Sequence, residues 1–77
     1  NLHYQERALG EAEAVLRSGY QRNPESVEVL NNLAQVLSEL GRDEEALQLI
    51  DHAVQLEGPF QSEVAATRSG IYKRLGR

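Results

Sequence analysis

The side chains in this sequence that most often carry out catalytic chemistry are few and scattered. Its 77 residues include two histidines, His3 and His52, and no cysteine. His52 directly follows Asp51, but neighbouring residues on a helix point about a hundred degrees apart and therefore form no catalytic dyad. No two histidines stand four residues apart, as an HExxH zinc site would require. We therefore expect no catalytic residues and no metal ligands.

Motifs that hold phosphates or cofactors are also absent. The six glycines stand singly, so no glycine-rich loop is available to hold a phosphate group. Glu44 and Glu45 are adjacent carboxylates, but the first turn of a helix favours such a pair without any catalytic role. The sequence therefore predicts no enzyme activity and no cofactor.

Composition and charge restrict the partners. Twelve acidic and eight basic residues give a net charge of −4, which disfavours general binding of nucleic acid or of anionic membranes. No apolar run approaches the roughly 18 residues of a membrane span, and no signal-peptide pattern opens the chain. Because 40% of the residues are hydrophobic and 26% are charged, we expect one small folded domain.

Four stretches have the spacing of amphipathic helices. Apolar residues recur at intervals of three and four, which places them on one helix face, and no stretch alternates as a half-buried strand would. Proline and glycine interrupt the pattern at 23–24, 41–43 and 58–59. We expect an all-α fold of about four helices, at residues 2–22, 27–40, 44–56 and 61–75. The first helix has an alternative in which it breaks near residues 7–10.

The predicted helix ends carry capping signals. Ser26 and Asp43 can cap the second and third helices with their side-chain oxygens. Gly41 and Gly58 stand where each helix would stop and the chain would need a left-handed residue. Gln61 or Ser62 would start the fourth helix.

The helix pairs repeat along the chain. Glu11-Ala12 recurs as Glu45-Ala46 at an interval of thirty-four residues, with Leu16 and Gly19 recurring as Ile50 and Ala53. The segment Leu40-Gly41-Arg42 recurs as Leu75-Gly76-Arg77 at thirty-five, which indicates one inserted residue near 58–60.

A thirty-four-residue helix-turn-helix repeat with this pattern resembles the tetratricopeptide repeat. The positions that carry the resemblance are Leu30, Leu33, Ala34, Leu37, Gly41, Ala46, Ile50, Ala53 and Pro59. The alanines stand where the helices of this family approach most closely. Leu30 replaces the usual tryptophan, and Arg68 stands where an apolar residue is expected, so the fourth helix should bury only one face.

The resemblance also divides the chain. It implies a single domain over 1–77, with a partial repeat at 1–26, a full repeat at 27–60 and a capping or partial-repeat helix at 61–77. Residues 1–6 resemble the tail of a first helix, so we expect the chain to begin inside a repeat of a longer protein.

The resemblance implies a scaffold that binds a protein or peptide on the concave face formed by the first helices. The candidate binding residues lie off the apolar stripe of the two predicted first helices: Glu28, Asn31, Asn32, Gln35, Ser38, Glu39, Thr67, Lys73 and Arg74. Amide side chains suit a peptide backbone because they both donate and accept hydrogen bonds. Asn32 stands where members of the family often hold that backbone. Glu63 and Thr67 occupy places where a carboxylate clamp needs Lys and Arg, so we expect no such clamp.

Three other interpretations stay open. The candidate residues can simply form the solvated face of an amphipathic helix. The repeats can also serve self-association or brace a larger protein, because incomplete repeats leave apolar residues such as Leu2, Leu9 and Leu75 uncovered. Finally, residues 44–75 can form a helix-turn-helix that binds DNA, although Gly76 would occupy the place of its apolar anchor.

Charge is unevenly distributed between the two ends. Residues 1–60 contain eleven acidic and four basic residues, whereas 61–77 contain one acidic and four basic residues. This polarity would let the acidic part of one molecule meet the basic end of another, or let the basic end receive an acidic peptide. The preference of a helix C-terminus for cations explains the same pattern without a partner.

Overall fold

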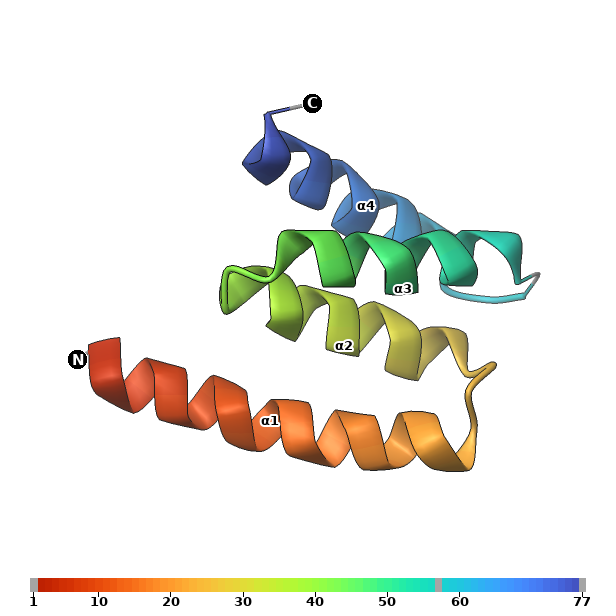
Figure 1. The fold of residues 1–77 in the computed structure, drawn as a ribbon. Coiled ribbons are helices and arrows are strands. Elements are labelled where there is room, and N and C mark those ends of the chain that lie inside the picture. Colours follow the sequence, from red (N-terminus) through yellow and green to blue (C-terminus); the bar gives the residue numbers. More distant parts are fainter. Residues whose placement is uncertain (1, 57, 77) are drawn as a thin grey trace.

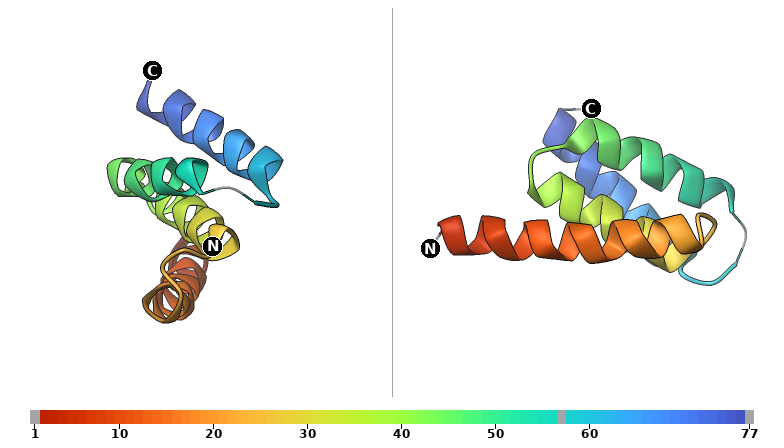
Figure 2. Two further views of the ribbon diagram at one scale, coloured as in Figure 1. Left: turned by 90° about the vertical axis from the view of Figure 1, so that its right-hand side faces the viewer. Right: turned by 60° about the horizontal axis from the view of Figure 1, so that its bottom comes forward.

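Four helices make up the protein in a computed structural model, which describes residues 2–56 and 58–76, with side chains from Glu6 onward. They are α1 (Leu2–Arg22), α2 (Val27–Glu39), α3 (Asp43–Gln55) and α4 (Gln61–Leu75). The helices lie in a row in chain order, with α1 and α4 on opposite sides of the α2–α3 pair (Figures 1 and 2). The all-α prediction of four helices is confirmed, and α1 runs through Gly10 without a break.

Short polar contacts fix where the helices begin and end. Ser26 caps α2 as predicted, since its Oγ accepts a hydrogen bond from the Val29 amide at 3.3 Å. Gly41 has φ of 85°, the left-handed conformation that allows the tight turn into α3. Asp43, the predicted cap of the third helix, lies instead inside the first turn of α3, and its Oδ1 accepts a hydrogen bond from Ser38 Oγ at 2.6 Å.

The turn before α4 contains a residue in an unusual backbone conformation. Phe60 has φ of 73° and precedes Gln61, the first residue of α4. Gln61 Nε2 donates a hydrogen bond to the carbonyl of Leu56 at 2.7 Å, which ties the start of α4 to the end of α3. This turn contains the region where the repeat interval predicts one inserted residue.

The core is formed by α2, α3 and α4. Its buried apolar side chains are Leu30, Leu33, Ala34, Leu37, Ala46, Leu47, Ile50, Ala53, Val64 and Ile71. The three alanines are completely buried, as predicted for positions of close helix approach. Only Val64 and Ile71 come from α4, which confirms that this helix buries a single face.

The first helix packs against the edge of this core. Leu16 and Tyr20 contact the core cluster, and Gly19 lies beside Val29 of α2, where a β-carbon would be 3.6 Å from the valine. Of the residues predicted to be uncovered, Leu9 is half-buried. Leu75 packs against the core, so its predicted exposure is wrong, and the side chain of Leu2 lies outside the described residues.

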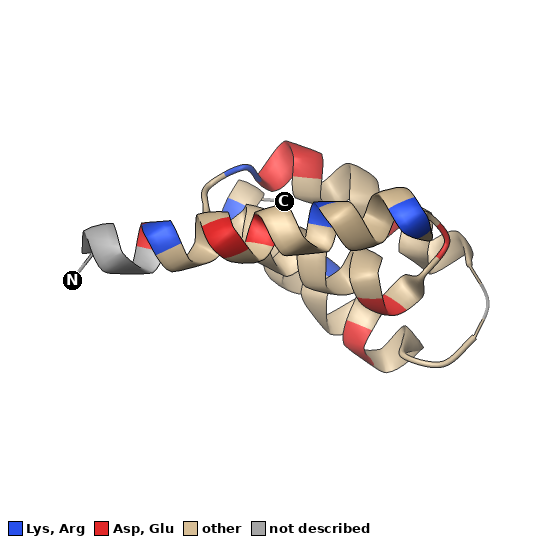
Figure 3. Ribbon diagram, turned by 90° about the horizontal axis from the view of Figure 1, so that it is seen from below, with Lys and Arg blue, Asp and Glu red and all other residues tan. Residues whose placement is uncertain are grey.

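A ring of four charged side chains fastens α1 to the turn between α2 and α3. Arg17 Nε lies 2.6 Å from Glu13 Oε2, and its NH2 group lies 2.5 Å from Glu45 Oε2. Arg42 closes the ring through ion pairs with Glu13 and, at 3.9 Å, with Glu45. Figure 3 shows acidic and basic segments alternating along α1.

This ring alters the acidity of its members. Hydrogen bonds from Arg17 and then from Arg42 lower the pKa of Glu13 below its ordinary value. Hydrogen bonds to Glu45 and then to Glu13 raise the pKa of Arg17. Both shifts favour the charged forms of Glu13 and Arg17.

Candidate functional site

The groove between α2 and α4 holds most of the predicted binding residues. It is a hollow of about 270 Å³ lined by Gln35, Ser38, Glu39, Thr67, Gly70, Ile71 and Arg74. We call it the α2–α4 groove. Its two walls are α2 and α4, the two predicted first helices. They come to lie side by side because α3 runs back in the opposite direction between them.

Two hydrogen bonds across the groove set its geometry. Gln35 Nε2 donates to Thr67 Oγ1 at 3.3 Å, joining the middle of the two helices. Arg74 NH1 donates to the carbonyl of Ser38 at 2.7 Å, near the end of α2. The Ser38 carbonyl also accepts a hydrogen bond from the Gly41 amide at 3.0 Å, so the guanidinium adds a second hydrogen bond and places a positive charge at the C-terminus of α2, where the helix dipole favours it.

The structure separates eight of the nine predicted residues, all except Asn31, into three groups. Gln35, Ser38, Glu39, Thr67 and Arg74 line the α2–α4 groove. Glu28 and Asn32 are exposed on α2 but are not part of its lining, and Lys73 lines a different groove between α3 and α4.

Two of the nine do not lie on the solvated face that the apolar spacing predicts. Asn31 and Ser38 are buried, with 7% and 6% of their surface exposed. The prediction that they lie off the buried face is wrong, because α2 is covered from more than one side. Ser38 Oγ is already engaged by Asp43, whereas Asn31 Oδ1 has no hydrogen-bond partner among the described residues.

The floor of the groove comes from residues that the candidate set omits. Ile71 is almost completely buried, and Gly70 has no atom within 4 Å of the place of a β-carbon. The absence of a side chain at Gly70 keeps the groove open between Thr67 and Arg74. The sequence signal was a small residue one turn beyond Thr67, on the same helix face.

The groove has the chemistry of a binding surface. Exposed Gln35 can donate and accept, Glu39 can only accept, and Arg74 can only donate. Among the described residues no group of three His, Cys, Asp or Glu side chains could hold a metal ion. No helix of the described part of the chain is long and apolar enough to cross a membrane.

Comparison with protein families gives one match. The tetratricopeptide repeat family model matches residues 3–70, which is most of the chain and includes all of α1, α2 and α3 except Leu2. Comparisons with curated proteins and with solved structures give no match.

Proposed function

Because the chain belongs to the tetratricopeptide repeat family, we propose that its α2–α4 groove binds an extended segment of a partner protein. Repeats of this family generally mediate protein–protein interaction and are typically non-catalytic scaffolds. The observation that carries the proposal is the juxtaposition of Gln35, Thr67 and Arg74 on the two walls of one open groove.

The size of the groove favours a peptide over an enclosed small molecule. Its volume of about 270 Å³ lies below the roughly 300–1,000 Å³ of pockets that enclose drug-sized ligands. An extended segment would instead lie along the helices and reach beyond the hollow, toward exposed Asn32 on α2.

The polar groups suit the alternating donors and acceptors of a peptide backbone. The Gln35–Thr67 hydrogen bond is exposed and, at 3.3 Å, long, so a peptide amide or carbonyl can replace it at small cost. The Arg74 guanidinium can meet a peptide carboxylate, although its bond to the Ser38 carbonyl holds it in place. Glu39 supplies an acceptor on the opposite wall.

Selection from a random peptide library would test this function. Peptides selected on the whole chain should bind Asn32→Ala and Gln35→Ala more weakly by roughly 2- to 12-fold, the equivalent of one hydrogen bond. Gln48→Ala, on the exposed surface of α3, is the matched control and should bind as the parent does. Circular dichroism should show unchanged helicity for all three. Equal binding by all variants would remove the α2–α4 groove from the interaction.

A further inference from the structure

The two outermost helices, α1 and α4, leave partly exposed a set of residues whose repeat counterparts in α3 and α2 are buried. By the interval of thirty-five, α4 residues Ala65, Arg68, Ser69 and Tyr72 correspond to Leu30, Leu33, Ala34 and Leu37 of α2. The four α2 residues are completely buried. In α4, Ala65 and Ser69 are exposed, and Arg68 and Tyr72 are only half-buried.

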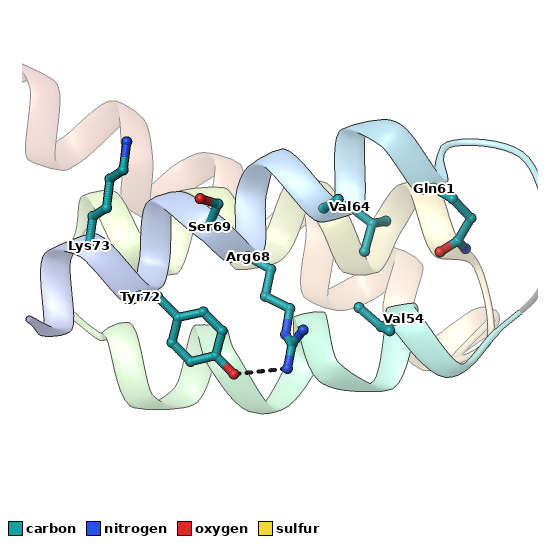
Figure 4. A pocket seen from close by; sticks show the side chains of 8 residues that line it. Val54, Gln61, Val64, Arg68, Ser69, Tyr72 and Lys73 are labelled. Carbon is teal, nitrogen blue, oxygen red and sulfur yellow. Dashed lines mark hydrogen bonds between the residues drawn. The ribbon is translucent and has the colours of Figure 1, made fainter. Parts of the chain in front are cut away.

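These α4 residues line a second, larger groove. It measures about 680 Å³ and opens between α4 and the end of α3, beside Val54 (Figure 4). We call it the α3–α4 groove. Its lining includes the α4 counterparts of α2 residues that are buried in the core, so it lies where a further helix would pack on α4 as α3 packs on α2.

The opposite edge presents a helix of the matching kind. By the interval of thirty-four, α1 residues Ala12, Leu16 and Gly19 correspond to Ala46, Ile50 and Ala53 of α3. The α3 residues are completely buried, whereas all three α1 residues are only half-buried. Val15 extends this α1 face and is 72% exposed, although its counterpart Leu49 packs against the core.

We propose that the α3–α4 groove of one molecule receives α1 of a second copy, in an antiparallel head-to-tail contact. Among the described residues, three large apolar side chains are exposed, and the contact would cover two of them, Val15 and Val54. It uses surfaces other than the α2–α4 groove, so it stands apart from the proposed peptide binding.

Charge supports the antiparallel orientation. In the α2–α3 pair the end of one helix meets the start of the next, so the end of α4 would meet the start of the second copy's α1. Lys73 lines the groove at the end of α4. The start of α1 carries Glu6 and Glu11, and the 72% exposed Glu11 side chain forms an ion pair at 3.4 Å with Arg7, which is 83% exposed. Glu6, Arg7 and Glu11 together carry one net negative charge, which is opposite in sign to Lys73 at the end of α4.

Arg68 already forms its polar contacts within its own molecule, so it can be buried in such a contact. Its Nε donates to Asp51 Oδ1 at 2.9 Å, and its NH2 group donates to the Tyr72 hydroxyl at 2.9 Å. Its guanidinium lies 5.0 Å from the centre of the Tyr72 ring. Figure 4 shows the two side chains next to each other, joined by the hydrogen bond to the Tyr72 hydroxyl. A second helix can cover this arginine without leaving an unpaired charge, because its partners come from its own molecule.

The two faces differ, so the contact is heterologous, and a pair of molecules in contact keeps one free face of each kind. Association therefore continues past two molecules, as an open row or as a ring of three or more. Sedimentation velocity over a wide range of protein concentration should show a mass that rises with concentration beyond that of a dimer. A mass that stays at one chain, or stops at two, would overturn the proposal.

Complementary variants make the test specific. Val15→Asp blocks the α1 face and Ser69→Arg blocks the α3–α4 groove, so each variant alone should lose every species above the monomer. A mixture of the two should form a dimer and nothing larger, because one intact face of each kind remains. Gln21→Asp and Gln21→Arg, at an exposed α1 position, should assemble as the parent does. A mixture that remains monomeric would contradict the contact.

Disulfide cross-linking provides a second test that does not depend on variants designed to block a face. The chain has no cysteine, so Val15→Cys and Ser69→Cys introduce single thiols. Their mixture should form the mixed disulfide in preference to either symmetric one, with helicity unchanged by circular dichroism. A random distribution of disulfides would contradict the proposed pairing.

Discussion

Enlarging Ala46 to leucine would test the closest approach of the helices. Ala46 is completely buried, and so are Leu33, Leu37 and Ile50 in the same core cluster, which leaves no room for three added carbons. Overpacking of this kind costs about 1–3 kcal/mol. For a domain of this size each kcal/mol lowers Tm by roughly 4–8 °C, so Ala46→Leu should melt roughly 4–24 °C below the parent.

Thermal and urea unfolding followed by circular dichroism would measure this loss. The matched control is Ala14→Leu, at an exposed position of α1, where leucine and alanine have nearly equal helix propensity. It should leave stability within about 0.5 kcal/mol of the parent. If Ala46→Leu were as stable as this control, the alanine would not mark a close helix contact, and the packing argument would fail.

Three further changes test the backbone conformation of two glycines and the pH dependence of stability. Gly41→Ala should destabilise by about 1–2 kcal/mol in urea unfolding, because Gly41 has a left-handed φ of 85° with open space around it. Gly10→Ala, in the interior of α1 with equally open space, should instead stabilise by up to about 1 kcal/mol, and two shifts of the same sign would contradict this reasoning. The pKa of Glu13 is lowered in the folded protein, first of all by its hydrogen bond with Arg17. Its contribution to folding stability is therefore complete above the pKa of Glu13 in the unfolded chain, and it is lost as the pH falls through the lower pKa in the folded protein. As the pH falls below about 4.5, the ordinary pKa of a glutamate, Tm should therefore fall less for Glu13→Gln than for the parent. An equal fall in Tm for the two proteins would contradict this.

The four helices could be predicted because their signals are local. Apolar spacing, the Ser26 cap and the left-handed Gly41 each act within one or two helical turns, and the structure retains all of them. The alanines could also be predicted, since a small residue recurring at a fixed place in a repeat indicates a close backbone approach. Asp43 was misplaced by one residue, because Ser38 competes for its side chain.

The burial of Asn31 and Ser38 could not be predicted from spacing alone. A single apolar stripe describes a helix with one neighbour, but α2 contacts α1 through Val29, α4 through Gln35, and α3 through its leucines. The buried arc is therefore wider than the stripe and includes polar residues.

The charged ring and the α3–α4 groove depend on how separate helices meet. The sequence offers Glu13 and Arg17 only as a spacing of four residues on one helix. Glu45 and Arg42 join them because the turn before α3 comes to lie beside α1. Such contacts appear only once the helices are placed in space.

The uneven placement of buried side chains makes the attachment of α1 depend more on exposed charges than the packing of α2 against α3 does. Among its described side chains none is fully buried, so its detachment costs far less than unfolding of α2, α3 and α4 together. The ion pairs of Glu13, Arg17, Arg42 and Glu45 join α1 to the rest of the molecule. The side chains of Arg17, Arg42 and Glu45 are 38–45% exposed. Dissolved ions screen such charges but hardly affect a buried leucine. We therefore expect rising salt concentration to weaken the attachment of α1 more than it weakens the buried packing of α2, α3 and α4.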